Sequence, residues 1–263
     1  MKVKPKKYLG QHFLKDNSIA QKIVEAYFEI PSDSFLIEVG PGMGVLTDFI
    51  LNKNEKGFIA LDVDEESVDF LKKKYPENSD NFRLMDFLNT DFAQLTKGKW
   101  NVIGNFPYNI SSQILFKVLE YRKQVDVLVG MFQKEVGIRI CANAGSKDYG
   151  ILSVLVQAFY EADYLFTVQP GSFNPPPKVK SGVIRLIKKS DINLNCNEKL
   201  FFKVVKTAFN QRRKMLSNAL KPLIGETNLQ SNLLSKRAEQ LSVHDFTELT
   251  SMIEKVMNEK SLK

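Results

Sequence analysis

The chain has 263 residues, of which 43% are hydrophobic, so it is long enough for one large domain and a smaller one. A net charge of +7 favours a polyanionic partner, although solvated lysines explain many such balances. No apolar run reaches membrane-spanning length, no secretory signal is recognisable, and Cys141 and Cys196 lack the spacing of a metal site. We therefore expect a cytoplasmic protein with free thiols, no membrane segment and no bound metal.

Hydrophobic periodicity predicts strands and helices in alternation over most of the chain. After a basic arm at Met1 to Lys7, Asp16 or Asn17 is expected to cap a helix that reaches Phe28. Apolar strands that alternate with helices indicate a parallel sheet covered on both faces. The expected strands are 35–39, 58–61, 82–85, 100–103 and 125–132, and the expected helices are 45–51, 65–75, 111–122 and 133–143.

The pattern changes towards the C-terminus. A buried helix is expected at 151–160, and strands 164–168 and 183–187 flank a proline-rich loop at 170–181. Beyond a polar stretch that begins near Ser190, no strand pattern recurs. Helices are expected at 199–209, 215–224, 232–241 and 244–257. We expect a catalytic domain over residues 1–189, including the arm, and a small all-helical domain over residues 190–263.

Four consecutive predicted strands end on residues that suit a ligand. A glycine-rich turn at Gly40 to Gly44 joins a strand to a helix, and Asp62 ends the next strand about twenty residues later. Asp86 follows the third strand, where it is either a ligand-binding acid or a helix cap or surface-loop acid. Asn105-Phe106-Pro107-Tyr108 follows the fourth, and its amide and aromatic ring suit a flat, amine-bearing ring. The G-x-G-x-G spacing, with an acid two residues before it, is typical of methyltransferases that bind S-adenosylmethionine.

On these motifs the chain resembles the KsgA family of ribosomal RNA adenine dimethyltransferases over nearly its whole length. The resemblance rests on six ordered stretches: Gly10 to Leu14, Glu38 to Gly44, Asn105 to Tyr108, Gln133 to Val136, Phe173 to Val179, and Phe209 to Lys214. It implies a Rossmann-like S-adenosylmethionine-dependent methyltransferase domain followed by a small helical domain. Asp62 stands where many relatives have glutamate, and Phe106 replaces the commoner leucine.

The resemblance also implies the site residues. Contacts with S-adenosyl-L-methionine are expected from His12, Leu14, Gly40, Gly42, Asp62, Asp86 and Asn105. The exocyclic amine of adenine is a poor nucleophile because its lone pair is delocalised into the ring. We expect the Asn105 side-chain oxygen and the Phe106 carbonyl to accept its N–H groups, Pro107 to fix the loop, and Tyr108 and Phe173 to hold the ring.

The function implied is dimethylation of N6 on two adjacent adenosines near the 3' end of small-subunit (16S) ribosomal RNA, late in subunit biogenesis. The expected partner of this monomer is that RNA or a pre-ribosomal small subunit, contacted through Lys4, Lys6, Lys7, Arg212, Arg213 and Lys214. Two alternatives stay open: an assembly factor whose binding role outweighs its methylation, and a large-subunit ribosomal RNA adenine methyltransferase. A small-molecule methyltransferase is disfavoured by the basic arm and the helical domain.

Overall fold

The computed structural model describes residues 3–53, 57–225 and 229–261, so Met1 and Lys2 of the predicted arm lie outside the described residues. Contacts between Cα atoms divide the chain into two compact units. The first comprises residues 1–137 and 161–188, and the second comprises residues 138–160 and 189–263. Residues 138–160, which sequence analysis placed in the catalytic domain, therefore go with the helical segments, because their helix packs against a helix that begins at Glu198.

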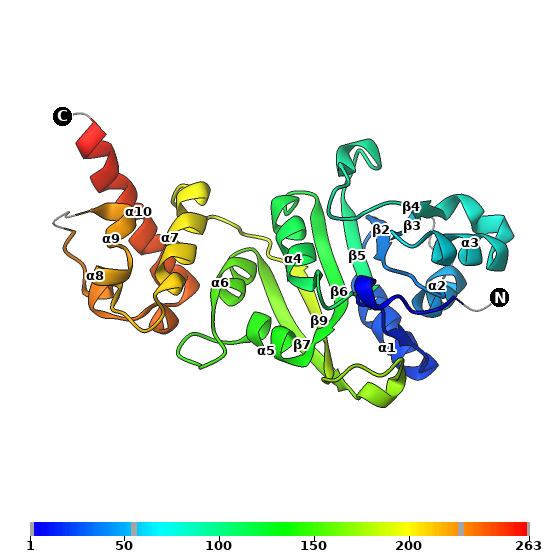
Figure 1. Cartoon of the computed structure of the whole chain (residues 1–263). Coiled ribbons are helices and arrows are strands. Elements are labelled where there is room, and N and C mark those ends of the chain that lie inside the picture. Colours follow the sequence, from blue (N-terminus) through cyan, green and yellow to red (C-terminus); the bar gives the residue numbers. More distant parts are fainter. Residues whose placement is uncertain (1–2, 54–56, 226–228, 262–263) are drawn as a thin grey trace. The chain divides into compact units, whose positions relative to one another are not determined.

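The first unit is built on a seven-stranded sheet (Figure 1). Five strands run parallel in the spatial order β4-β3-β2-β5-β6, and β9 continues the sheet antiparallel to β6, with β7 at the edge. Their bounds are β2 Phe35–Val39, β3 Phe58–Asp62, β4 Phe82–Leu84, β5 Trp100–Asn105, β6 Val125–Gln133, β7 Tyr160–Val168 and β9 Ser181–Lys188. The central strands are buried on both faces, which explains their continuous apolar runs. The predicted Rossmann-like fold is confirmed.

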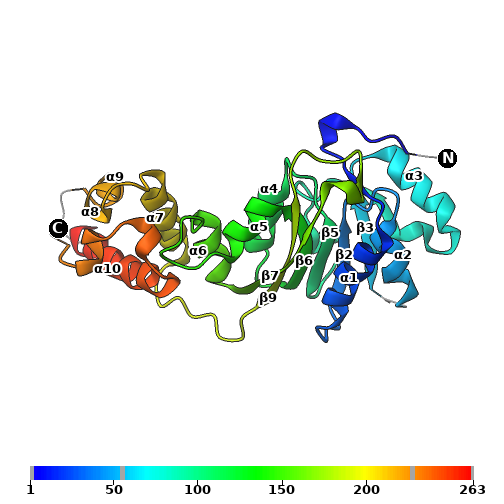
Figure 2. The same ribbon diagram turned by 90° about the horizontal axis from the view of Figure 1, so that it is seen from below.

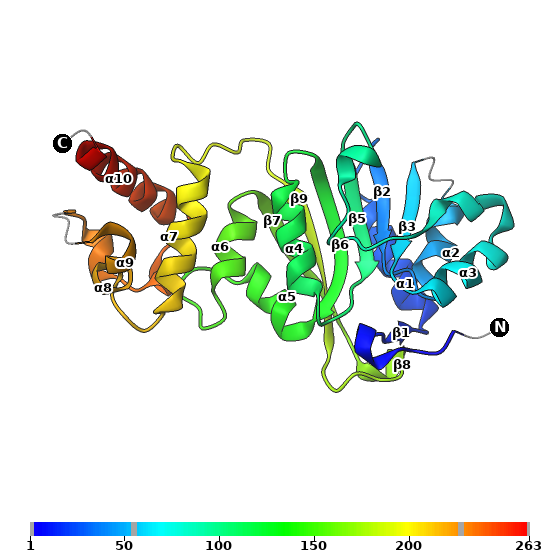
Figure 3. The same ribbon diagram turned by 45° about the horizontal axis from the view of Figure 1, so that its top comes forward.

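Helices cover both faces of this sheet. The core on one face combines residues of α1 (Asn17–Phe28), α2 (Val45–Asn52) and α3 (Glu65–Lys74). On the other face lies α4 (Ser111–Glu120), which Figure 3 shows in front of the strands with α1 behind them. The Asp16 side chain caps α1 as predicted, accepting from the backbone N–H groups of Ser18 and Ile19. Helix α5 (Lys134–Cys141) follows β6 directly.

A second, two-stranded sheet joins the N-terminal segment to the proline-rich loop. Strand β1 (Phe13–Leu14) pairs antiparallel with β8 (Phe173–Asn174), and Figure 3 shows the pair below the main sheet. Short 3-10 helices precede each strand, η1 at Lys7–Leu9 and η4 at Pro170–Ser172. Two further 3-10 segments of this unit are η2 (Pro76–Asn81) and η3 (Phe92–Gln94). Sequence analysis missed the β1–β8 pair because a two-residue strand has no periodicity to detect.

The second unit is helical (Figure 2). Helix α7 (Glu198–Asn210) is contacted by α6 (Ile151–Gln157), α8 (Leu216–Ala219), α9 (Lys221–Ile224) and α10 (Val243–Ser261). The helix expected at 215–224 is two short ones, because Pro222, the second residue of α9, has no N–H to continue the hydrogen bonding of α8. The helix expected at 232–241 is two 3-10 segments, η5 (Asn232–Ser235) and η6 (Ala238–Gln240). Among the described residues, no helix is both long enough and apolar enough to cross a membrane.

Candidate active site

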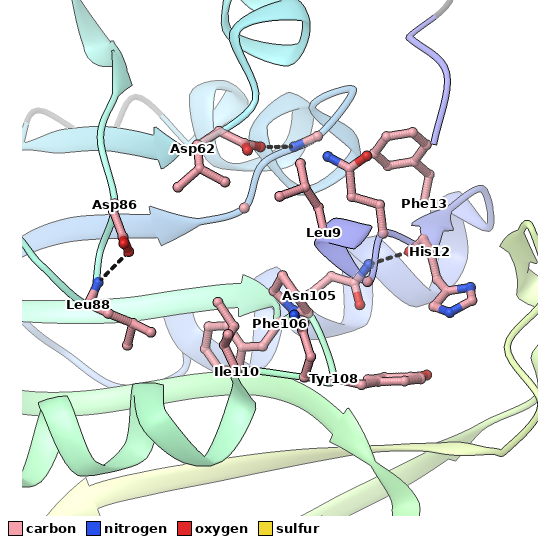
Figure 4. A pocket seen from close by; sticks show the side chains of 17 residues that line it. Leu9, His12, Phe13, Asp62, Asp86, Leu88, Asn105, Phe106, Tyr108 and Ile110 are labelled. Atoms are coloured by element: carbon pink, nitrogen blue, oxygen red, sulfur yellow. Dashed lines mark hydrogen bonds between the residues drawn. The ribbon is translucent and has the colours of Figure 1, made fainter. Parts of the chain in front are cut away.

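A cavity of about 340 Å³ opens in the first unit at the carboxyl ends of the parallel strands. It is lined by the N-terminal segment 9–13, by strand-end residues from Gly40 to Asp86, and by the loop 105–110 (Figure 4). Ligands of open α/β sheets bind at this edge, because the loops after parallel strands meet there. The volume lies within the range of small-molecule sites.

The glycine turn after β2 brings the backbone to the cavity wall. Gly40, Gly42 and Gly44 all have positive φ, at 68°, 57° and 81°. A Cβ atom on Gly42 would lie 2.8 Å from the Phe13 ring, so a larger residue would displace the N-terminal segment. Glycine is therefore favoured at Gly42 for two reasons: its backbone has a positive φ, and a side chain would collide with the Phe13 ring.

Asp62 faces the cavity from the end of β3. One of its carboxylate oxygens accepts the Asp64 backbone N–H at 2.9 Å, and the other accepts that of Gly42 at 3.3 Å. Burial raises the pKa of Asp62 to about 6, because removing a carboxylate from water disfavours its charged form. A buried carboxylate at this position suits the ribose hydroxyls of a nucleoside.

The raised pKa predicts that cofactor affinity depends on pH. The ionised Asp62 accepts hydroxyl protons best, so affinity should fall as pH drops through 6, by up to about tenfold one pH unit below the pKa. The sign for the free protein is opposite. Since the folded pKa exceeds the ordinary 3.8, the contribution of Asp62 to the free energy of unfolding decreases as pH rises from that value to about 6.

Isothermal titration with S-adenosylmethionine across this range measures the affinity. The Asp62→Asn variant is the control, because it should bind weakly with a flat profile. An affinity of the unsubstituted protein that is independent of pH would contradict the assignment.

Asp86 has a local structural role and also lines the cavity. One carboxylate oxygen accepts the Leu88 backbone N–H at 2.9 Å and the other accepts the Asn89 side-chain amide at 2.6 Å, so Asp86 stabilises the turn after β4. It also lines the cavity, on the side opposite His12 in Figure 4. Its hydrogen bonds keep the carboxylate in a fixed orientation at the cavity wall.

Asn105 is the last residue of β5 and its side chain is oriented by the N-terminal segment. The amide nitrogen Nδ2 donates to the His12 carbonyl at 3.0 Å (Figure 4). This bond engages one of the two N–H groups of Nδ2 and orients the amide, which leaves Oδ1 as the acceptor that Asn105 can offer to a ligand. Phe106 is 1% exposed as a whole residue, and its ring packs close to Gly104 and Gly130 beside the cavity.

Two predicted site residues lie outside this cavity. Leu14 lines a smaller neighbouring one with Glu38 and Asn105. Burial raises the pKa of that Glu38 to about 8, so its carboxyl group is largely protonated at neutral pH. Phe173 is 2% exposed and belongs to the hydrophobic core, opposite Leu14 in the β1–β8 pair. Stacking on an adenine needs an open ring face, which the buried Phe173 lacks. The structure therefore does not support the stacking role expected of Phe173.

Several lining residues escaped the sequence analysis. Leu9, Gln11 and Phe13 reach the cavity from the N-terminal segment, and Gln11 also donates to Asp64 at 3.1 Å. The stretch Gly10 to Leu14 was recognised, but nothing in it shows which side chains turn inwards. Val63, directly after Asp62, lines the cavity while remaining half exposed. An exposed apolar residue beside a strand-end acid is the signal that could have identified it.

Lys6, expected to contact RNA, instead holds the N-terminal segment in place. Its ammonium group forms an ion pair with Asp64, whose side chain is fully buried. Burial alone would raise the pKa of Asp64, but hydrogen bonds from Lys6, Gln11 and Ser67 outweigh it and lower that pKa. Lys4 and Lys7 are exposed and remain candidates for RNA contacts.

Substituting Lys6 should therefore affect the cofactor more than the RNA. Lys6→Met keeps most of the side-chain volume but removes the charge that pairs with Asp64, so the lining segment 9–13 should loosen. We expect the KM for S-adenosylmethionine to rise several-fold with a smaller change in the KM for RNA. Lys72→Met, on the exposed face of α3, is the matched control. A change confined to RNA binding would show that Lys6 contacts RNA as first expected.

The basic residues of the second unit, Arg212, Arg213 and Lys214, differ in their surroundings. Arg212 donates through Nε to Glu239 at 2.7 Å and through a terminal nitrogen to the Lys147 carbonyl at 2.6 Å, which ties two loops of that unit together. Arg213 and Lys214 are exposed beside a groove of about 320 Å³ formed by residues 209–214. Arg213 and Lys214 therefore remain the candidates for the phosphate contacts expected of this motif.

A glycine turn and a buried acid lie at the carboxyl ends of the parallel strands, beside a cavity of nucleoside size. This arrangement fits an S-adenosylmethionine-dependent methyltransferase. The family model described as ribosomal RNA adenine dimethylase matches residues 2–255. The chain belongs to this family.

Individual proteins agree with the family assignment. The chain is 53% identical to ribosomal RNA small subunit methyltransferase A of Cytophaga hutchinsonii, over 96% of this chain and 98% of that one. It is 52% identical to the protein of the same name from Flavobacterium johnsoniae, over 96% and 97%. A crystal structure of a dimethyladenosine transferase from Plasmodium falciparum aligns with a TM-score of 0.75 and 27% identity, over 95% and 98%. The 23S rRNA methyltransferase ErmE, at 21% identity and a TM-score of 0.66, shares the fold.

Proposed function

We propose that the chain transfers two methyl groups from S-adenosylmethionine to N6 of each of two adjacent adenosines near the 3' end of small-subunit ribosomal RNA. The observation that carries this proposal is the orientation of Asn105. Its amide nitrogen is bonded to the His12 carbonyl, so its oxygen is presented in the cavity beside the cofactor residues. An oriented acceptor is what an adenine amine requires.

The residues present fit the cofactor. The glycine turn permits close approach, Asp62 offers a buried carboxylate, and Asp86 offers an acceptor held by its own turn. When bound, S-adenosylmethionine supplies an electrophilic methyl group on its sulfonium sulfur. His12, Asp62 and Asp86 would hold it at the strand ends, within reach of the loop 105–108.

The loop would activate the adenine amine by accepting its two N–H groups. Asn105 Oδ1 accepts one N–H group and the Phe106 carbonyl accepts the other. These two hydrogen bonds favour a tetrahedral nitrogen, whose lone pair is no longer delocalised into the ring. Both oxygens also stabilise the positive charge that develops on nitrogen as it attacks. The proton becomes acidic only after methyl transfer, so no strong general base is needed. Tyr108 provides the aromatic face against which the adenine stacks.

The target base must leave its stack to enter this cavity. Exposed Lys4 and Lys7 in one unit, and Arg213 and Lys214 in the other, suit contacts with the RNA backbone, which position the RNA without identifying bases. We expect the protein to act as a monomer in the cytoplasm on late pre-ribosomal small subunits.

Primer extension on both ribosomal RNAs of a deletion strain tests the proposed substrate. Dimethylated adenines stop reverse transcriptase, so the stop in small-subunit RNA should disappear and return when the gene is restored. Loss of a stop in the large subunit alone would favour the rival enzyme class.

A further inference from the structure

Ser181 is a buried hydroxyl that no step of the mechanism has used. It is the first residue of β9, lies opposite Gln133 of β6 and has no exposed surface. Its Oγ lies 2.5 Å from the phenolic oxygen of Tyr108, more than seventy residues earlier in the chain. Burial raises the pKa of Tyr108, so its phenol stays neutral and the two hydroxyl groups share a hydrogen bond.

A second contact holds the ring of Tyr108. The His12 ring lies 5.6 Å from it between centroids, with 32° between the planes. His12 is itself fixed, because its Nδ1 donates to the Pro175 carbonyl at 2.8 Å. Figure 4 shows the Tyr108 ring below Asn105, with the His12 ring above and to the right of Tyr108. The ring is therefore held at its hydroxyl end by β9 and along its side by the N-terminal segment.

Fixing this ring matters because of what stacks on it. A tyrosine whose hydroxyl end is free rotates about its side-chain bonds, and an adenine stacked on it would move with it. Methyl transfer needs the amine aligned with the methyl donor, and small misplacements slow such reactions strongly. A hydroxyl held by a buried partner loses this freedom before the substrate arrives.

We infer that Ser181 is a positioning residue for the target adenine, acting through its hydrogen bond to Tyr108. This inference rests on the proposed function, because it assumes that an adenine stacks on Tyr108. Serine suits the position because one hydroxyl group can both donate and accept a hydrogen bond. The pairing of β9 with β6 fixes the backbone of Ser181 next to Gln133. Ser181 itself touches neither the cofactor cavity nor the expected path of the methyl group.

The test compares kinetics of four variants on small subunits that lack the modification. Ser181→Ala and Tyr108→Phe each remove one side of the hydrogen bond and keep the stacking ring. We expect each to lower kcat about fivefold to tenfold, a loss equivalent to one ordinary hydrogen bond, with the KM for S-adenosylmethionine unchanged. The double variant should be no slower than either single variant, because both remove the same interaction. Ser181→Thr keeps the hydroxyl and should restore most of the rate.

A control separates positioning from stability. Ser153→Ala removes another fully buried serine hydroxyl, one that donates to the Arg139 carbonyl in the helical unit. It should lower Tm about as much as Ser181→Ala and leave kcat unchanged. An unchanged kcat in Ser181→Ala, a change confined to KM, or losses that multiply in the double variant would each overturn the inference. Inactivity of the unsubstituted enzyme on these subunits would instead overturn the proposed function.

Discussion

Replacing Asn105 with alanine should lower methyl incorporation about 100-fold or more, the scale for removing one preorganised polar group from a reacting centre. The reason is geometric, since Nδ2 is held by the His12 carbonyl and Oδ1 is the acceptor that we propose for the amine. Binding of pre-ribosomal particles should persist, because exposed lysines and arginines supply it. Single-turnover assays with tritiated cofactor measure the rate, and filter binding measures the particles.

Two comparisons sharpen this experiment. Asn52→Ala, at the exposed end of α2, makes the same chemical change away from the cavity and should leave the rate intact. The Asn105 variant also loses its bond to His12, so cofactor affinity should weaken as well, but by less than the rate. Unchanged incorporation in the Asn105 variant would defeat the role assigned to it. A rate that recovers fully at saturating cofactor would reduce that role to cofactor binding.

Gly130→Ala should destabilise the protein by about 1–3 kcal/mol, the range for overpacking a filled core. Gly130 on β6 and Gly104 on β5 are direct neighbours across the sheet, and together they make room for the Phe106 ring. A Cβ at Gly130 would lie 2.1 Å from a Phe106 ring carbon, which is far inside van der Waals contact. Differential scanning calorimetry should show a Tm lower by about 5 °C, and activity should fall because Phe106 belongs to the active loop.

A compensating change tests the cause of that loss. Phe106→Leu lacks the ring edge that meets Gly130, so Gly130→Ala combined with Phe106→Leu should be more stable than Gly130→Ala alone. Gly98→Ala is the matched control, since a Cβ there meets nothing within 4 Å. A Gly130 variant as stable as the Gly98 control would show that the sheet relaxes around the added methyl group.

Local patterns predicted the sheet because its strands are buried on both faces and leave long apolar runs. The strand-end residues Asp62, Asp86 and Asn105 were found for the same reason, since parallel strands bring their carboxyl ends to one edge. These residues line one cavity because the strands that carry them run parallel and lie close together in the sheet.

What the sequence could not supply depends on contacts between distant residues. Lys6 meets Asp64 fifty-eight residues later, so nothing near Lys6 distinguishes it from the exposed Lys7. Phe173 lies in a stretch that resembles the family and was expected to hold the adenine, yet the residue pairs with Leu14 and its ring is buried. The Ser181 hydrogen bond to Tyr108 joins the start of β9 to the loop after β5, two segments that only the completed sheet brings together. Side-chain roles of this kind require the folded structure.

The most direct test of the function is methyl transfer in vitro to small subunits purified from a strain that lacks the enzyme, with nucleoside analysis of the labelled RNA. We expect label in small-subunit RNA as N6,N6-dimethyladenosine, at about two modified residues and four methyl groups per subunit. Each adenine amine accepts two methyl groups, and the cavity receives one extruded base at a time. Label found only in large-subunit RNA, or in a nucleoside other than methylated adenosine, would contradict the proposed function.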